Sequence, residues 1–335
     1  MWPLSGRNNK ENKMELSIII VSWNVRDDLV RCLRSIEENR PRAEFEIIVV
    51  DNASSDGTVE SIKRDFPKVT IIANNENRGF AAANNQGIKK ARGRYLLFLN
   101  PDTIVHPLSL DVLMNFMDGN SNAGACGPKL LNRDGTTQPS TRRFPTFRGA
   151  LYRHTVLRFL GIFRSEYEKL LMKDFNYDGQ ADVDQLSGAA LMVRRPVIDE
   201  VGIMDENFFM FYEEVDLCYR LKQAGWRSVF IPEAVITHLS GRSAEDIPVK
   251  IRIMKLTSML KFFRKHRGKL ITGLFSCVFK PAVILGNICN IAIGSVTYIF
   301  AAITLNKRIR AKNAAKVKNS AILAGKYSWQ LLFKM

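Results

Sequence analysis

Acidic side chains stand at three separate places in this sequence where a carboxylate could take part in chemistry. Asp51 opens the segment DNASSDGT, Asp102 ends the triplet NPD, and Glu213 and Glu214 begin the segment EEVD. A carboxylate can accept an N–H hydrogen, hold a hard cation such as Mg²⁺, or take a proton from a hydroxyl as a general base. The residues around each acid indicate which of these roles it could serve.

Asp51 follows the apolar run EIIVV, so it stands at the end of an expected strand. A carboxylate there can accept the imino hydrogen of uracil or thymine, while turn hydroxyls, Ser54 among them, and backbone amides meet a ribose and a phosphate. An ordinary turn also explains the pattern, because Asp51 and Asp56 are both favourable as turn and helix N-cap residues. The sequence leaves both interpretations open.

Asp102 follows the apolar run RYLLFL, as the last residue of Asn100-Pro101-Asp102. Hard cations often use only one or two carboxylates beside substrate phosphates, so Asp102 is a candidate ligand of a divalent metal, Mg²⁺ or Mn²⁺. Such an ion would offset the charge that develops on a departing diphosphate. A plain turn at the start of the next helix fits the same residues. His238, in VITHLSG, is a second candidate ligand, although a lone His is usually structural.

Three acids, Glu213, Glu214 and Asp216, stand at an expected helix N-terminus directly after the segment FFMFY. Acids are favourable there through the helix dipole alone, and Asp216 has Arg220 four residues later, as in a surface ion pair. The preceding apolar segment suggests a further role, because an apolar wall raises the pKa of a carboxylate toward the range of a general base. All three acids are therefore candidates for a catalytic base.

Short apolar runs alternate with helical patterns along the first hundred residues. Strands are expected at 16–23, 46–51, 69–73 and 94–100, with helices at 25–39, after Asp56 and at 80–91, and further strands at 184–195 and 227–232. Between residues 132 and 182 we expect loops and short helices. Alternation in such short units predicts an α/β fold with a mostly parallel sheet covered by helices.

The carboxyl ends of parallel strands meet at one edge of the sheet, where the ligands of such folds bind. Polar and turn-forming residues follow the first strands at this edge, namely Ser22, Asn24, Asp51, Ser54, Asp56, Asn100 and Asp102. The sequence thus predicts a nucleotide site at this edge of the sheet.

Several classes of protein are disfavoured by what the sequence lacks. It contains no GxGxxG after the first strand, no GxxxxGK[ST], no GxSxG and no HExxH. The five cysteines are scattered and include no CxxC pair, which argues against a disulfide framework or a zinc site. Residues 1–13 are too polar for a signal peptide, and we expect them to form a disordered leader.

The net charge of +16 belongs to the C-terminal part of the chain. Residues 250–335 contain 17 of the 49 Lys and Arg residues and no acid, so the first 249 residues balance 32 basic against 33 acidic side chains. Such a one-sided excess favours an anionic partner, either a membrane surface or nucleic acid. A long uncharged stretch, 281–305, interrupts the basic residues and argues against a nucleic-acid groove.

These features, taken together and in this order, resemble the family-2 glycosyltransferases of the GT-A fold, in particular the bacterial rhamnosyltransferase-like group. The resemblance covers roughly residues 16–241. It rests on the segments SIIIVSWN, VVDNASSDGT, NRGFAAANNQGI, YLLFLNPDT, SGAALMVRR, FFMFYEEVDLCYRLKQAGW and ITHLSG. The first carboxylate of the usual Asp-x-Asp signature is missing, because Asn100 stands in its place.

The resemblance implies a role for each candidate residue. Asp51 would bind the base of a UDP or dTDP sugar donor, Asp102 and His238 would hold the metal, and Glu214 would be the catalytic base. Glu213 and Asp216 stay possible as that base. Substrate contacts are implied at Ser22, Asn24, Ser54, Asp56, Asn84 and Asn100, with Gly188 and Ala189 beside the donor sugar and the acceptor. The implied reaction is an inverting transfer, and an inactive nucleotide-sugar-binding scaffold is the alternative.

The C-terminal region indicates attachment to a membrane. Basic residues flank the apolar stretch on both sides, and the positive-inside tendency would place both flanks in the cytoplasm. A re-entrant hairpin bending near Gly286-Asn287, or helices lying in the interface, would satisfy this condition. A buried helix of a larger core is the alternative.

We therefore expect a protein on the cytoplasmic face of the inner membrane that acts on a lipid-linked or surface glycan acceptor, such as a growing polysaccharide. The expected parts are the leader at 1–13, a nucleotide-sugar half at 14–127, an acceptor and catalytic half at 128–248, and the membrane region at 249–335.

Overall fold

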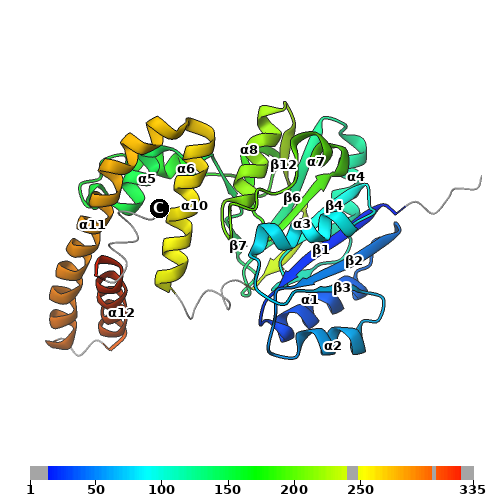
Figure 1. Cartoon of the computed structure of the whole chain (residues 1–335), viewed down its shortest axis with the longest axis horizontal. Coiled ribbons are helices and arrows are strands. Elements are labelled where there is room, and N and C mark those ends of the chain that lie inside the picture. Colours follow the sequence, from blue (N-terminus) through cyan, green and yellow to red (C-terminus); the bar gives the residue numbers. More distant parts are fainter. Residues whose placement is uncertain (1–13, 240–247, 304–306, 326–335) are drawn as a thin grey trace, which may run out of the picture. The chain divides into compact units, whose positions relative to one another are not determined.

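The computed structural model describes residues 14–239, 248–303 and 307–325 of the 335-residue chain (Figure 1). These residues form two compact units. The sheet unit contains residues 14–140, 177–204 and 217–239, and the helical unit contains residues 141–176, 205–216 and the described residues from 248 onward. The expected leader, residues 1–13, lies outside the described residues, and the domain boundaries predicted from the sequence stay predictions.

The first half of the sheet is parallel, in the strand order β3-β2-β1-β4. These strands are β1 (Leu16–Ser22), β2 (Phe45–Asp51), β3 (Thr70–Ala73) and β4 (Tyr95–Leu99). Every residue of β1 is buried, as the continuous apolar run Leu16–Val21 requires of a central strand covered on both faces. The four strands expected here from the sequence are thus confirmed.

The second half of the sheet is mixed, and it continues in the order β4-β11-β6-β12-β5. Its strands are β5 (Thr103–Val105), β6 (Ala123–Leu131), β7 (Thr137–Gln138), β9 (Ala181–Val183), β11 (Ala190–Arg194) and β12 (Arg227–His238). β11 runs antiparallel to both β4 and β6, whereas β12 is parallel to β6. The strand expected at 184–195 is broken into β10 (Gln185–Leu186) and β11, with Ser187–Ala189 between them.

Helices pack on the strands of the sheet unit, as the alternating pattern predicts (Figure 1). They are α1 (Arg26–Glu38), α2 (Thr58–Asp65), α3 (Phe80–Lys90), α4 (Ser109–Gly119) and α7 (Arg195–Val201). α3 lies very close to β1, because a Cβ at Gly87 would stand 2.4 Å from Cγ2 of Ile19. The predicted α/β fold, with a sheet flanked by helices, is confirmed; the sheet is parallel in its first four strands and mixed as a whole.

The helical unit is built from short segments and three longer helices. Its elements are β8 (Thr141–Arg142), α5 (Phe147–His154), η1 (Val156–Arg158), α6 (Arg164–Leu171), α10 (Pro248–Arg267), α11 (Lys269–Ile303) and α12 (Lys307–Ala324). Helix α8 (Glu213–Gln223) begins in this unit and ends in the sheet unit. Stacked and edge-on rings of Phe147, Phe263, Phe275 and Phe279 join α5, α10 and α11.

The apolar C-terminal segment forms one helix, α11, which packs against α12 (Figure 1). Among the described residues, Lys269–Ile299 is the one helical stretch long and apolar enough to cross a membrane. The hairpin expected to turn near Gly286-Asn287 is wrong, because both residues lie within the single helix α11. Gly286 instead admits the backbone of Thr155, and the buried Asn287 accepts a hydrogen bond of 2.9 Å from Arg252.

Candidate active site

Ser22 and Asp51 lie opposite each other at the carboxyl ends of β1 and β2, and both are buried. The Asp51 carboxylate accepts one hydrogen bond, 2.9 Å from the Ser54 amide to Oδ2. Its Oδ1 and the Ser22 hydroxyl are also buried, yet neither has a hydrogen-bond partner among the described residues. Buried polar atoms are rarely left unpaired, so this pair of atoms is arranged to meet a polar group of a ligand.

The loop after β2 is held to the loop after β1 by polar contacts. Asn24, with φ of 53°, donates its amide to Ser54 Oγ at 2.9 Å and accepts the Ser55 amide at 2.8 Å. Asp56 accepts the Arg26 amide at 2.9 Å and the Thr58 hydroxyl at 2.5 Å. Burial opposes ionisation of Asp56, but these hydrogen bonds hold its pKa below the usual range. Asp56 therefore braces the loop, which agrees with its interpretation as a turn residue.

Asp102 and His238 meet at the end of β4 although they are far apart in the sequence. β12 pairs with β5 so that His238 stands opposite Thr103, and Asp102 Oδ1 lies 3.3 Å from His238 Nε2. Gln138 Oε1 lies 2.7 Å from the other ring nitrogen, Nδ1. The amide oxygen only accepts, so this contact favours a hydrogen on Nδ1, and the neutral ring in that tautomer would direct its Nε2 lone pair toward Asp102.

The Asp102–His238 pair fits a divalent cation. A carboxylate oxygen and an imidazole nitrogen about 2.1 Å from one ion, and at right angles, would lie about 3 Å apart, close to the observed separation. Within the described residues no group of three or more His, Cys, Asp or Glu side chains could hold a metal. An ion here would therefore take its other ligands from phosphate oxygens and water, as Mg²⁺ commonly does.

Gly188 and Ala189 lie beside the Asn100 turn. The Asn100 amide donates to the carbonyl of Ala189 at 2.9 Å, and the Asn100 side-chain amide is 3.4 Å from His238 Nε2. These contacts bring together three of the segments that the sequence predicts at the site. Asn84 differs from that expectation, because it is buried in α3 and its side chain donates to the Phe80 carbonyl at 2.9 Å.

In the helical unit, an unusual backbone turn precedes the acids at the start of α8. Phe211 and Tyr212 are consecutive non-glycine residues with positive φ, 69° and 75°. The Tyr212 carbonyl then accepts the Asp216 amide at 2.8 Å, which starts the helix. A bulky residue in the left-handed region costs on the order of 1–3 kcal/mol, and such strain is concentrated at functional sites.

Glu213 and Glu214 share a buried environment, and each has a buried Oε2 without a hydrogen-bond partner among the described residues. Burial raises the pKa of both carboxyls. The charge of Glu214 raises the Glu213 pKa further, whereas backbone hydrogen bonds and the ammonium of Lys255 lower that of Glu214. Both carboxyls thus have a pKa above the usual range of a glutamate. Raised carboxyl pKa values are found at acid–base sites.

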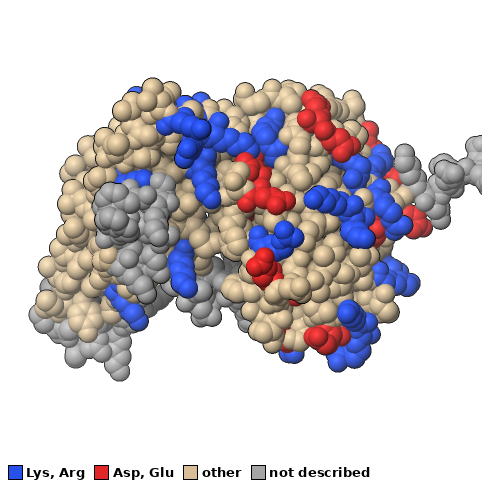
Figure 2. Space-filling view, in the orientation of Figure 1, with Lys and Arg blue, Asp and Glu red and all other residues tan. Residues whose placement is uncertain are grey.

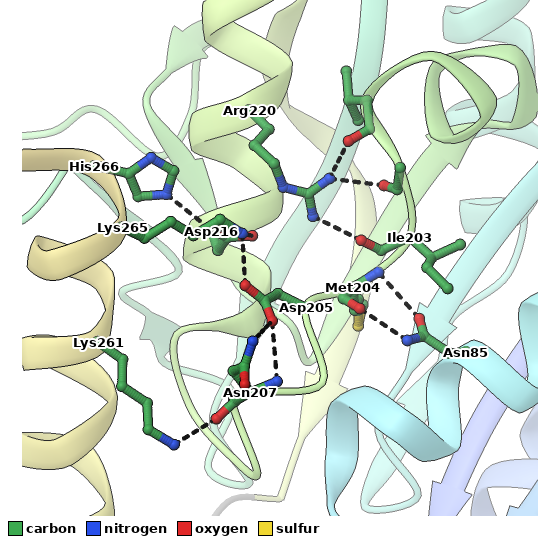
Figure 3. Close-up of polar contacts among 12 residues, drawn as sticks. Asn85, Ile203, Met204, Asp205, Asn207, Asp216, Arg220, Lys261, Lys265 and His266 are labelled. Atoms are coloured by element: carbon green, nitrogen blue, oxygen red, sulfur yellow. Dashed lines mark hydrogen bonds and ion pairs between the residues drawn. The ribbon is translucent and has the colours of Figure 1, made fainter. Parts of the chain in front are cut away.

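Asp216 is fully buried and is held by two residues of α10, His266 and Lys265 (Figure 3). His266 Nε2 lies 2.7 Å and Lys265 Nζ 2.9 Å from its Oδ1, and Lys265 also bonds Asp205 at 2.7 Å. Asp216 is inside the protein, so the surface position expected for it is wrong. Its contacts with Lys265 and His266 favour an anchoring role over that of a base.

Arg220 has a different function in the sheet unit (Figure 3). Its guanidinium donates to the carbonyls of Gly202 at 2.8 Å and Ile203 at 2.9 Å, just after α7. The next residue, Met204, exchanges two hydrogen bonds with the side chain of Asn85 on α3, of 2.8 and 3.0 Å. Residues 202–204, which precede the aromatic segment FFMFY at 208–212, are thus fixed within the sheet unit.

Two residues with a direct effect on the candidate groups could not be identified from the sequence. Gln138 orients His238 from a two-residue strand 100 positions away, and no local pattern marks it. Lys255 lies in the basic C-terminal region, where the sequence does not distinguish it from lysines that could contact a membrane surface. Asp51 and Asp102 share one edge of the sheet, because β2 and β4 are the parallel neighbours of β1. Glu214 lies in the helical unit, and its convergence with them stays a prediction.

Comparison with known proteins identifies the family. Residues 17–201 match the family described as Glycosyl transferase family 2. The N-acetylglucosaminyl-diphospho-decaprenol L-rhamnosyltransferase of Mycobacterium tuberculosis is 31% identical over 70% of this chain and 78% of its own length. A hexosyltransferase of low-salt glycan biosynthesis from Haloferax volcanii is 28% identical over 62% of each chain.

A solved structure shares the fold. The mannosyltransferase PcManGT from Pyrobaculum calidifontis, in complex with GDP-Man and Mn²⁺, superposes with a TM-score of 0.56 over 92% of this chain and 86% of its own, at 17% identity. That identity supports likeness of fold alone, whereas the family match covers more than half of the chain and the M. tuberculosis relative is aligned over most of its length. This chain belongs to the family 2 glycosyltransferases, in their rhamnosyltransferase-like group.

Proposed function

We propose that this glycosyltransferase moves L-rhamnose, with inversion at the anomeric carbon, from a nucleoside diphosphate onto a lipid-linked glycan acceptor. The observation that carries the proposal is the arrangement at the sheet edge. The unpartnered Asp51 Oδ1 and the Asp102–His238 pair stand at the carboxyl ends of β2 and β4, on either side of β1. Asp51 suits a nucleobase, and the Asp102–His238 pair suits a cation bound to a diphosphate. The edge therefore suits a nucleotide-sugar.

The nucleotide would bind across the first two strand ends. Asp51 Oδ1 would accept the imino N–H of uracil or thymine, because it is buried and has no hydrogen-bond partner among the described residues, whereas the Ser54 amide bonds Oδ2. The Ser22 hydroxyl beside it would take a second polar atom of the nucleoside. Uracil and thymine present the same imino group, so UDP and dTDP sugars share this contact, and the donor sugar is inferred from the mycobacterial relative.

Asp102 and His238 would hold the divalent metal, Mg²⁺ or Mn²⁺, against the diphosphate. The archaeal mannosyltransferase with the same fold was solved with Mn²⁺. When bound, such an ion offsets the negative charge that develops on the leaving diphosphate. The protein residues supply the rest: Gln138 contacts Nδ1 of His238 and orients the ring, and the Asn100 side-chain amide lies 3.4 Å from the other ring nitrogen, Nε2.

Glu214 is the proposed general base, with Glu213 as its protonated neighbour. The acceptor hydroxyl would give its proton to Glu214 as its oxygen attacks the anomeric carbon from the side opposite the diphosphate. Lys255 supports this role, since its charge favours the ionised form of Glu214. The unpartnered Oε2 atoms of both carboxyls also favour a site that is completed by substrate.

The acceptor is proposed to carry a lipid. The M. tuberculosis relative acts on N-acetylglucosaminyl-diphospho-decaprenol, a sugar linked through a diphosphate to an isoprenoid. The long apolar helix α11 and the basic charge of residues 250–335 support attachment to an anionic membrane, where such a substrate resides. The cytoplasmic face is proposed because the donors are water-soluble nucleotides.

A transfer assay with purified protein tests the proposal. We expect release of nucleoside diphosphate from dTDP-rhamnose only when the lipid-linked acceptor and Mn²⁺ or Mg²⁺ are both present. Glu214→Gln should lower the transfer rate by about 10²–10⁴-fold, the usual contribution of a general base, while donor binding persists. Glu37→Gln, an exposed acid on α1, is the matched control and should retain full activity.

Three results would contradict parts of the proposal. Full activity of Glu214→Gln would assign the base to another residue. Binding of the donor without any transfer to a panel of lipid-linked acceptors would indicate a nucleotide-sugar-binding scaffold. Transfer that is unaffected by EDTA would remove the metal from the proposed reaction.

A further inference from the structure

A cavity of about 620 Å³ lies between α10 and α11 in the helical unit. Its lining is Thr257, Leu260, Lys261 and Arg264 from α10, and Lys269, Thr272, Gly273, Ser276, Cys277, Lys280 and Pro281 from α11. Four of these residues are basic and none is acidic. Figure 2 shows Lys and Arg side chains gathered over the junction of the two helices. The cavity is thus a concave surface with a positive charge.

Thr272 provides a second, independent indication of a ligand. The residue is only 4% exposed, and its Oγ1 is buried without a hydrogen-bond partner among the described residues. A helical Thr commonly bonds the carbonyl one turn earlier, so an unpaired hydroxyl in a cavity wall is unusual. A hydroxyl donor among Lys and Arg side chains is the set of groups that binds a phosphate.

The surface of α11 next to the cavity is apolar. Leu270, Leu274 and Val278 are 76%, 66% and 66% exposed, and they follow one another at intervals of four residues. Leu285, Ile288, Val296 and Ile299 continue the same face along the helix and are also exposed. The opposite face packs inside the unit through Phe279, Val283 and Asn287, which are buried. α11 therefore presents an exposed apolar stripe that begins beside the basic cavity.

We propose that the cavity between α10 and α11 binds the phosphate of an anionic membrane phospholipid, whose acyl chains lie along the apolar stripe of α11. Lys269 and Lys280 from α11 and Arg264 from α10 would surround the phosphate, and Thr272 would donate to it. The exposed stripe requires a ligand with an apolar part, which favours a lipid over inorganic phosphate. This site goes beyond the proposed transfer reaction, because it would fix the depth and rotation of α11 in the interface.

The cavity is separate from the candidate catalytic carboxylates. Helix α10 has about 3.6 residues per turn, so Thr257, Leu260, Lys261 and Arg264 share one face of it. Lys255, whose charge acts on Glu214, stands on the opposite face of α10 by the same spacing. A diphosphate in the cavity could not place its sugar at Glu214 without passing around the helix. This geometry favours a structural phospholipid over the lipid-linked acceptor as the occupant.

Thr272→Val is the decisive variant, because it removes the hydroxyl without changing charge or shape. We expect it to weaken binding to vesicles of phosphatidylglycerol and phosphatidylcholine about tenfold, the weight of one hydrogen bond to a charged group. Binding to vesicles of phosphatidylcholine alone should not change. The melting temperature should hold or rise, since the substitution removes a buried unpaired hydroxyl.

Two double variants with the same change in charge distinguish binding in the cavity from general electrostatic attraction to an anionic surface. Arg264→Gln with Lys280→Gln removes two cavity charges, whereas Lys250→Gln with Lys318→Gln removes two exposed charges outside it. We expect the cavity pair to lower the affinity for phosphatidylglycerol vesicles at least about tenfold more than the control pair. Equal losses, together with wild-type binding by Thr272→Val, would overturn the site.

Competitors test the occupant. Inorganic phosphate at millimolar concentration should not displace the protein from phosphatidylglycerol vesicles, and displacement would assign a free anion to the cavity. Vesicles in which an isoprenoid diphosphate replaces phosphatidylglycerol at equal charge should bind the protein less tightly. If Thr272→Val weakened binding to these vesicles as much as to phosphatidylglycerol vesicles, the occupant of the cavity would be the lipid-linked acceptor instead. Transfer to a short-chain acceptor in detergent should be unaffected by Thr272→Val, which separates this site from the proposed reaction.

Discussion

Two adjacent carboxyls, Glu213 and Glu214, have different surroundings at the start of α8. Burial acts on both, but the ammonium of Lys255 favours the ionised form of Glu214, whereas the charge that acts on Glu213 is that of Glu214 itself. A raised pKa keeps a carboxyl protonated to higher pH. Glu213 is thereby suited to remain neutral while Glu214 ionises and accepts a proton. The assignment of Glu214 as the base thus rests on charge environment as well as on its place in the sequence.

The pH dependence of transfer follows from this environment. The base must be ionised to act, so kcat/KM should rise with pH through the raised pKa of Glu214 and then level off. Lys255→Met removes a charge that favours the ionised form of Glu214. The rise of kcat/KM with pH should therefore occur at higher pH in this variant. The exposed Lys250 on the same helix gives the matched control, Lys250→Met, which should keep the wild-type profile. An unchanged limb in Lys255→Met would contradict Glu214 as the titrating base.

The stability of the protein should depend on pH through Glu213. Its folded-state pKa lies above the unfolded value, so its stabilising contribution is complete below the unfolded pKa and is lost as pH rises through the folded pKa. Glu213→Gln mimics the protonated form and should be more stable than wild type at pH 8 by on the order of 1 kcal/mol. The difference in melting temperature should disappear near pH 4. A variant less stable than wild type at pH 8 would show that Glu213 is ionised there and paired.

The metal ligands can be tested through the residue that orients one of them. Gln138→Leu leaves Asp102 and His238 in place but removes the hydrogen bond that fixes the His238 ring. Loss of such a partner typically weakens metal binding about 10–100-fold, so the Mn²⁺ concentration for half-maximal activity should rise by this factor. Saturating Mn²⁺ should restore most activity to Gln138→Leu but little to Asp102→Asn. An unchanged metal response in both variants would contradict the proposed metal site.

At the scale of elements, α10 holds the first turn of α8. His266 and Lys265, at the end of α10, both contact the buried Asp216, and Lys261 donates to the Asn207 carbonyl at 2.6 Å in the segment before the aromatic run. Because the strained residues Phe211 and Tyr212 lie between these two attachments, α10 fixes the backbone that presents Glu213 and Glu214. We therefore propose that Asp216 is a positioning residue.

Removal of this anchor should cost both stability and activity. Asp216→Asn leaves His266 and Lys265 beside a neutral side chain, and weakening buried hydrogen bonds to a charged group in this way typically costs about 1–3 kcal/mol, since Lys265 keeps its contact with Asp205. We expect a lower melting temperature and a reduced kcat with little change in the dissociation constant of the donor. The control is Asp27→Asn, whose carboxylate is exposed on α1. A stable variant with normal kcat would show that the contacts with α10 are dispensable.

The sequence predicts some elements well and others poorly, for physical reasons. The strands β1 to β4 are buried on both faces, so they appear as short apolar runs, and their ends locate Asp51 and Asp102. β6 was missed because Gly124, Gly127 and Pro128 give it the composition of a loop. It is held in place by long-range pairing with β11 and β12. The burial of Asp216 was also unpredictable, since its partners are about 50 residues away and look like membrane-binding charges.

At the scale of the whole molecule, charge and apolar surface are unevenly distributed along the chain. The first 249 residues are nearly neutral, and the basic excess with the apolar helix belongs to the remainder. The structure separates the functions of that remainder. Lys265 and His266 are used internally, Lys255 acts on Glu214, and Arg264, Lys269 and Lys280 line the cavity beside the exposed stripe of α11. On the proposals made above, a single basic region would contribute to anchoring, catalysis and membrane contact.

Membrane contact and donor binding should therefore be separable by substitution. Leu274→Glu places a charge in the middle of the exposed stripe and should weaken binding to anionic vesicles by at least about tenfold, since a buried Leu contributes about 1.5–3 kcal/mol. Leu108→Glu is the matched control, because Leu108 is similarly exposed, at 58% against 66%, but lies in the sheet unit. Transfer to a lipid-linked acceptor in vesicles should fall with vesicle binding in Leu274→Glu, while transfer to a short-chain acceptor in detergent and donor binding remain normal. Equal vesicle binding by the two variants would show that α11 does not contact the membrane. Loss of donor binding in Leu274→Glu would show that the apolar stripe of α11 stabilises the fold instead.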